Sequence, residues 1–433
     1  MHCEPLEVSS FPALPTPSTS AIFVVTALQR TEPSQHVKSR WSLQNNEECL
    51  LMHHYVQVLA SWFDVLDPAQ HFARVVPHRA AQCVPLQQAI FALSARHLSR
   101  ISDMNPYISD QYFKRCIDLL MPVVNETQAI IEEDILCAMV CLRLLEELDV
   151  PLSGCDNQRH LKGIQVLVNA QERSAATAGG LSQAAFWAGL HQEMFMAFIT
   201  QRPVAQALLS HCNIDRTCSP ADDCTWVYRI MVNFADVLTF CYGPALDPRS
   251  SPGVNKGLRR KAQWDQLTRY TREWHESHPP HFSPTYSASP APGDIFPSIY
   301  FHLPIQVTAS LYYHVSCILL AIHNPALHQE LPSSSATILH LRTAARALHA
   351  LDTTVRENVR ALCGIALCNP WLAPAMTMTS TALTMCGEHF CDVGREEQDG
   401  MMWLLVKNEE KHGWPTGTAQ KYLKRVWGWE GEG

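Results

Sequence analysis

The sequence is poor in glycine and in charge. Glycine accounts for 18 of the 433 residues, and charged residues make up 17%. The chain contains no glycine-rich phosphate-binding loop, no glycine-flanked serine elbow and no His-Glu-x-x-His motif. It also lacks an excess of positive charge, because 33 Lys and Arg stand against 41 Asp and Glu. A protein that binds nucleic acid by its own charge needs a basic face, so direct DNA binding by this chain is not expected.

The sequence shows no feature of a secreted or membrane protein. No Lys or Arg precedes the apolar run 21–28, which is too short to span a membrane. The 16 cysteines do not form the framework of a small disulfide-linked domain. Several lie in apolar helical stretches, where we predict reduced, buried, small hydrophobic side chains: Cys49, Cys116, Cys137, Cys141, Cys241 and Cys317. We therefore expect a soluble intracellular chain.

The spacing of apolar residues predicts an all-α fold. From Asn45 onward they recur at helical intervals, in stripes that contain Leu50, Leu51, Tyr55 and Val58; Leu86, Ile90 and Leu93; Phe113, Ile117 and Leu120; and Ile135, Met139, Leu142 and Leu145. The same period continues through 158–168, 181–199, 226–240, 301–322, 336–351, 394–410 and 417–427. Short links favour antiparallel neighbours, and no alternating runs joined by hairpin turns occur. We predict an irregular array of antiparallel packed helices with no significant sheet.

Two segments differ from this helical pattern. Residues 1–44 are rich in Pro, Ser and Thr, which predicts a flexible leader before a helical domain at 45–433. The proline-rich stretch 278–297 is predicted to be a long internal loop that is free to move.

Three groups of Cys and His come closest to the spacing of a metal site: His275, His278 and His281; Cys386, His389 and Cys391; and Cys212, Cys218 and Cys224. The first group lies at a Pro-Pro loop and the second at the end of an apolar helix. The third lacks the two-residue gap that lets two thiolates bind one zinc ion. We interpret all three as structural and assign no metal or cofactor-binding residue.

The candidate catalytic residues also favour structural roles. Asp222 and Asp223 lack the third carboxylate three residues on that a magnesium-binding helix face would need. Ser94 lies in a helical run without the glycines that expose a nucleophile. No catalytic residue is assigned, and the chain is not expected to be an enzyme.

Runs of like charge are interpreted as parts of helices. Residues 132–134, Glu-Glu-Asp, are predicted to occupy the first turn of a helix, where carboxylates complement exposed amides. At least one of Glu146 and Glu147 is predicted to pair with a base such as Arg143 or a more distant arginine. The basic run is typical of a solvated helix face, with a nuclear import signal as the alternative; its members are Lys256, Arg259, Arg260 and Lys261.

Several runs, taken together and in order, resemble a known domain. They include His54–Tyr55 before Trp62-Phe-Asp64, then Phe72 and Val76–Pro77, Ala89-Ile-Phe-Ala-Leu-Ser-Ala-Arg-His97, Tyr112, Leu144-Leu-Glu-Glu-Leu148, His160–Leu161 with Gly163, Ala184-Ala-Phe-Trp187 with Gln192–Glu193, Trp226, Phe296–Pro297, Tyr313–His314, His323-Asn-Pro325, Cys363-Gly-Ile-Ala366, and Trp414-Pro-Thr416 with Trp427. From about Glu47 onward the chain resembles the fungal-specific transcription factor domain, the helical regulatory region of binuclear zinc cluster regulators. It departs from that pattern at His191, where the family commonly has Arg, and at Leu145, where an aromatic residue is frequent.

The N-terminal part of the sequence departs further from the pattern of such regulators. A member of the family that binds DNA itself carries six cysteines within about 30 residues, which hold two zinc ions. Here only Cys3 precedes Cys49, so no DNA-binding residue is recognised. Three explanations are open: a mis-assigned gene start, a regulator that reaches DNA through a partner, and a decayed copy.

The resemblance implies a transcriptional regulator of a metabolic pathway, often a secondary-metabolite gene cluster. It also implies a location in the nucleus, with the cytoplasm left open, and protein partners: a DNA-binding regulator, a coactivator or a second copy. A cavity between helices is expected to admit a small apolar effector, although Trp62, Trp187 and Trp226 are interpreted as core residues. The alternatives are a helical scaffold or adapter with no role at promoters, and an all-α enzyme whose site is assembled from distant residues.

Overall fold

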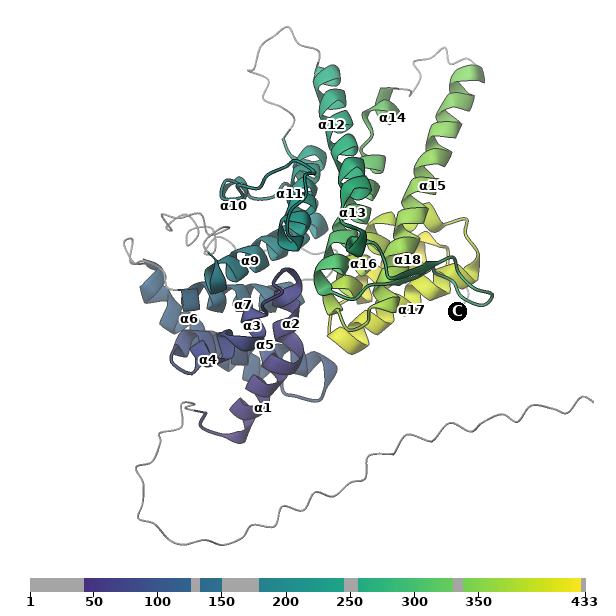
Figure 1. Ribbon diagram of the computed structural model, residues 1–433. Coiled ribbons are helices and arrows are strands. Elements are labelled where there is room, and N and C mark those ends of the chain that lie inside the picture. Colours follow the sequence, from purple (N-terminus) through teal and green to yellow (C-terminus); the bar gives the residue numbers. More distant parts are fainter. Residues whose placement is uncertain (1–42, 126–132, 150–178, 245–255, 330–337, 430–433) are drawn as a thin grey trace, which may run out of the picture. The chain divides into compact units, whose positions relative to one another are not determined.

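The computed structural model describes residues 43–125, 133–149, 179–244, 256–329 and 338–429. These residues are predominantly helical, which confirms the predicted all-α fold (Figure 1). The helices are α1 (Asn46–His54), α2 (Ala60–Phe63), α3 (His71–Arg74), α4 (Val76–Ala80), α5 (Val84–Ile101), α6 (Tyr107–Asn125), α7 (Glu133–Asp149), α9 (Gly180–Ile199), α10 (Gln206–Leu209), α11 (Asp223–Tyr242), α12 (Lys256–Ser277), α13 (Pro304–Ile322), α14 (Pro325–Gln329), α15 (Ile338–Cys368), α16 (Ala373–Cys386), α17 (Arg395–His412) and α18 (Gly417–Val426). Short π and 3-10 turns are η1 (Tyr55–Leu59), η2 (Asp64–Leu66), η4 (Pro280–Phe282) and η5 (Gly387–Phe390), and the strands are β1 (Tyr286–Ala288) and β2 (Ser298–Tyr300). The expected helix at 158–168 and nearly all of the expected leader at 1–44 lie outside the described residues.

Helix α5 is the centre of the N-terminal half of the described structure. It packs against α1, α6 and α7. The predicted stripe of Leu86, Ile90 and Leu93 is completely buried there, because residues three and four apart share one face of a helix. In the first stripe Leu51 is buried, whereas Leu50 is 54% exposed, so the prediction was wrong at Leu50.

Helix α13 is the centre of the C-terminal half. It contacts α11, α12, α15 and α16 and contains no Asp, Glu, Lys or Arg. Among the described helices it alone is long and apolar enough to cross a membrane, but 67% of the qualifying window is buried inside the protein. A helix with neighbours on several sides must be apolar all round, and this packing accounts for its composition.

The segment 278–297 contains short regular elements that we did not predict. It contains η4, and β1 pairs antiparallel with β2, with Tyr286 opposite Tyr300 (Figure 1). Asn369 holds β2 in place: its Nδ2 donates to the carbonyl oxygen of Ile299 at 2.9 Å, and its Oδ1 accepts from the backbone N–H of Phe301 at 3.1 Å. Strands of three residues are too short to show an alternating pattern, and for this reason the sequence did not indicate them.

Gly364 lets α15 approach this segment closely. A Cβ atom added at Gly364 would lie 2.2 Å from the carbonyl oxygen of Pro297. We expect Gly364→Ala to lower the free energy of unfolding by about 1–3 kcal/mol, the usual cost of overpacking, as measured by denaturant unfolding. Gly417→Ala is the control, because nothing lies within 4 Å of its added carbon. Equal losses in the two variants would contradict this account of Gly364.

Candidate functional site

The first Cys/His group, which we interpreted as structural, makes contacts mainly with other side chains and with the backbone. His275 stacks on Tyr313 with ring centroids 4.2 Å apart, and His278 Nδ1 lies 3.1 Å from the carbonyl oxygen of Pro279. His281 Nε2 lies 2.8 Å from a carboxylate oxygen of Asp223. Across the described ranges, no three or more His, Cys, Asp or Glu side chains are arranged to hold a metal ion. These contacts are typical of structural side chains.

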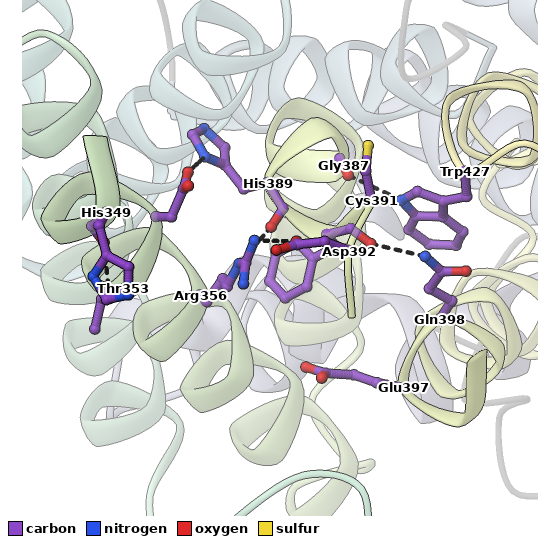
Figure 2. Close-up of polar contacts among 12 residues, drawn as sticks. His349, Thr353, Arg356, Gly387, His389, Cys391, Asp392, Glu397, Gln398 and Trp427 are labelled. Carbon is purple, nitrogen blue, oxygen red and sulfur yellow. Dashed lines mark hydrogen bonds and ion pairs between the residues drawn. The ribbon is translucent and has the colours of Figure 1, made fainter. Parts of the chain in front are cut away.

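The second Cys/His group spans the end of α16, η5 and the residue after it; its members are Cys386, His389 and Cys391. His389 Nδ1 lies 2.6 Å from Asp352 Oδ1 on α15. The His389 carbonyl oxygen accepts a hydrogen bond from Arg356, which also forms an ion pair with Asp392. Figure 2 shows these contacts beside the indole of Trp427, whose Nε1 donates to the carbonyl oxygen of Gly387 at 2.9 Å. These contacts connect η5 to α15 and to Trp427 at the end of α18. The polar groups of the second Cys/His group are therefore engaged in structural contacts.

The third predicted group consists of half-buried free thiols: Cys212, Cys218 and Cys224. Burial raises the pKa of Cys212 to about 12 and that of Cys224 to about 11. Without a bound metal these thiols stay protonated, and within the described residues they are not arranged with other ligands to hold a metal ion. Asp222 caps α11 by accepting a hydrogen bond from the backbone N–H of Thr225 at 2.8 Å, which is a structural role.

Burial of the cysteines agrees in part with the prediction. Cys116, Cys137 and Cys141 are buried, while Cys241 and Cys317 are half-buried. Cys49 is exposed, which corrects the prediction. Cys49 precedes the exposed Leu50 on α1, and both lie on the side of that helix that faces away from α5.

Arg143 is fully buried in α7 and pairs with both predicted carboxylates. Its Nη1 lies 3.2 Å from Glu146 Oε2, and its Nε lies 3.6 Å from Glu147 Oε1. A guanidinium removed from water needs such partners. The predicted pairing is confirmed, and it explains acidic residues near a helix C-terminus, where the helix dipole disfavours them.

The other charged runs and Ser94 also occupy positions typical of structural residues. Glu133 and Asp134 lie in the first turn of α7, as predicted, and contact Arg79 at 2.9 and 2.6 Å. Ser94 is fully buried within α5. In the basic run, the guanidinium of Arg260 lies 4.4 Å from the ring centroid of Phe240, whereas Arg259 and Lys261 are exposed on α12.

The three predicted core tryptophans are buried: Trp62, Trp187 and Trp226. Trp187 stacks on Tyr228 with ring centroids 3.6 Å apart and planes 6° from parallel. Trp226 accepts a hydrogen bond at its carbonyl oxygen from Trp274 Nε1 at 2.9 Å. Trp187 and Trp226 thus join α9, α11 and α12, whereas Trp62 lies on α2 and lines a small cavity.

A small cavity lies beside α7, α9 and α16. Its volume is about 40 Å³, and its lining includes Glu147, His191, Gln192 and Trp414. Cavities that admit benzene are about 150 Å³, so this one is too small for an organic effector. His191 Nδ1 contacts the hydroxyl of Tyr312, and burial lowers the pKa of His191 to about 4. At this position the chain therefore carries a neutral imidazole.

A larger pocket lies among α12, α13, α14 and α15, and we name it the α12–α15 pocket. Its volume is about 500 Å³, within the range of about 300–1,000 Å³ that small-molecule sites occupy. Helix α13 lies between α12 and α15 (Figure 1) and contributes Tyr313, Leu320 and Ala321 to the lining. The spacing of residues along the sequence did not indicate this pocket, because its walls come from four different helices.

A second depression is open and aromatic, and we name it the α17 cleft. It has a volume of about 740 Å³ and lies between the 293–300 segment, the end of α15 and α17. Tyr300 and Trp403 line it and are 46% and 51% exposed. Acidic side chains share the lining: Asp294, Glu396 and Asp399. Nothing in the spacing of these residues along the sequence indicated that they meet.

One comparison with known families gives a match. Residues 49–200 match a family described as the fungal specific transcription factor domain. The resemblance is therefore confirmed for this stretch, which is less than half of the chain. No curated protein and no solved structure matches the chain.

The matched stretch is similar to a domain of transcription regulators. It supports a regulator of the fungal transcription factor type. Such regulators are generally nuclear, and the domain favours a non-enzymatic role.

Proposed function

We propose that this protein regulates transcription of a metabolic gene set, such as a secondary-metabolite gene cluster, and that this chain contacts a protein partner in place of DNA. The observation that carries the proposal is the match of residues 49–200 to the fungal transcription factor domain. The net charge of −8 supports contact with protein over contact with phosphate.

The α17 cleft is the surface that best fits a protein partner. Trp and Tyr are enriched among the residues that dominate binding energy at interfaces, and Trp403 and Tyr300 are both half-exposed here. The acidic lining favours a partner segment in which Lys or Arg flank an apolar side chain. The contact of Asn369 with β2 fixes one wall, which lowers the cost of ordering the site on binding.

Gene deletion followed by complementation tests this proposal. We expect deletion to change the transcripts of a coherent metabolic gene set and the wild-type gene to restore them. Trp403→Ala should fold normally, weaken partner binding by about 30-fold, as loss of a dominant interface residue does, and fail to restore the transcripts. Trp371→Ala is the matched control, because Trp371 is 48% exposed but does not line the cleft.

The scaffold alternative gives a different result. Unchanged transcripts after deletion, together with a cytoplasmic location, would overturn the proposal in favour of an adapter without a role at promoters. Restored transcripts with Trp403→Ala would leave regulation intact but exclude the α17 cleft as the partner surface.

A further inference from the structure

The walls of the α12–α15 pocket are mostly apolar and have small side chains. They include Ala321 on α13, Ala326 on α14, and Ala347 and Ala350 on α15. Leu320, Leu327 and Leu351 add further apolar surface. Small side chains leave the volume open, so the pocket is a persistent feature of how these helices pack.

Hydrogen bonds fix the helices that form these walls. Trp264 Nε1 on α12 donates to the carbonyl oxygen of Leu320 on α13 at 2.8 Å. His314 on α13 contacts Asn358 on α15, with 2.8 Å between Nδ1 and Oδ1. Both bonds join α13 to one of its neighbours, so the site is formed before any ligand arrives, which reduces the ordering cost of binding.

The charge of the pocket has one sign. Among the described residues that line it, Arg272 is the only charged one. Its Nε lies 4.0 Å from Glu276 Oε1, and both side chains are about two-thirds exposed, so their attraction is weak. Helices α13 and α14 contribute no Asp, Glu, Lys or Arg. A ligand with an anionic group therefore meets a cation and no carboxylate among the lining residues that the structure describes.

Thr268 adds a polar group one helical turn from Arg272. Both residues line the pocket, and their spacing of four places them on the same face of α12. Thr268 Oγ1 is buried and has no hydrogen-bond partner within the described structure. Because this oxygen is buried, it does not face the open volume of the pocket, and Arg272 is the group that a ligand meets on this face of α12.

We propose that the α12–α15 pocket binds a mainly apolar organic molecule that carries one anionic group, such as a carboxylate. The apolar body lies against the alanines and leucines of α13, α14 and α15. The anionic group lies at the rim, where Arg272 pairs with it. This inference deepens the proposed function, because it makes the regulator responsive to a ligand, but binding itself is measured without reference to transcription.

Two dyes that differ in one group test this proposal on the purified full chain. Anilinonaphthalene sulfonate and phenylnaphthylamine share an aromatic body, and only the first is anionic. We expect saturable fluorescence binding at one site, with the sulfonate bound about fivefold more tightly, as suits an ion pair at a partly exposed rim. Arg272→Gln should abolish that preference, whereas Arg269→Gln, an exposed arginine of α12 outside the lining, should keep it.

A pocket-filling variant tests the location. Ala347→Trp should weaken binding of both dyes at least about tenfold, because the indole occupies the pocket. Ala345→Trp is the matched control: Ala345 is exposed on α15, and two residues of helix turn it about 200° away from Ala347. If circular dichroism shows that Ala347→Trp is unfolded, Ala350→Leu provides the same test with a smaller added side chain.

Either of two results would overturn the proposal. Dye binding that is unchanged by both filling variants places the dye elsewhere, and equal affinity of the two dyes for the wild-type chain removes the role of the anion. Because these measurements use the isolated protein, their failure is distinct from a failure of the transcript experiment.

Discussion

Replacing Trp187 by alanine is expected to lower the free energy of unfolding by about 3–5 kcal/mol, the usual cost of deleting a buried tryptophan. Trp187 is 1% exposed and stacks on Tyr228, and Phe186 lies edge-on to it with ring centroids 5.4 Å apart. The substitution removes the stacking contact between α9 and α11 and leaves a cavity that neighbouring helices fill only in part. Denaturant unfolding of the purified variant measures the loss.

Two further variants separate this effect from the general cost of losing an indole. Trp187→Phe should lose less than the alanine variant, because a ring remains against Tyr228. Trp371→Ala removes an indole that is 48% exposed, so its loss should stay below about 1 kcal/mol. A similar small loss for Trp187→Ala would show that the ring stack does not hold these helices together.

Contacts that depend on the geometry of a single helix could be predicted from the sequence. Leu86, Ile90 and Leu93 are buried as predicted, because helical periodicity alone places them on one face of α5. Arg143 could be paired with Glu146 and Glu147 because residues three and four apart on a helix are neighbours. Each of these inferences depends on local geometry only.

Features that depend on distant residues could not be predicted. Strand β2 is held by Asn369, some seventy residues further along the chain. A strand of three residues is also too short to show an alternating pattern in the sequence. The exposure of Leu50 and Cys49 depends on which side of α1 faces α5. In the same way, the α12–α15 pocket arises from the arrangement of α12 and α15 around α13, which no spacing within a single helix encodes.

A cluster of buried histidines gives the second large prediction. His97 is 1% exposed, and its Nδ1 lies 2.9 Å from His54 Nε2. The ring of Trp62 lies edge-on to His97 and to His412. Burial, followed by the charge of His54, lowers the pKa of His97 to about 3, and burial lowers the pKa of His54 and of His412 to about 4. The nearby cations Arg100 and Lys411 act in the same direction.

These lowered pKa values make the folded state sensitive to acid. The unfolded chain takes up protons on its histidines below a pKa of about 6.5, whereas the folded cluster stays neutral down to about pH 4. The free energy of unfolding therefore falls as the pH falls through this window, by up to about 1.4 kcal/mol per pH unit for each histidine. Asp64 acts in the opposite direction, because burial raises its pKa to about 7. Its carboxylate accepts backbone N–H bonds from Phe72 and Ala73 at 2.9 Å, which favour the ionised form, so we expect the histidines to dominate.

Unfolding measured between about pH 7 and about pH 5 tests this linkage. The wild-type chain should lose stability steadily as the pH falls, and His97→Gln should show a slope shallower by the uptake of about one proton, even though the variant is less stable at neutral pH. His302→Gln, at an exposed position before α13, should keep the wild-type slope. An unchanged slope in His97→Gln would mean that the cluster accepts protons without unfolding. In that case the contact of α1 with α5, and the rings of Trp62 and His412, must rearrange around a charged imidazole within the native state.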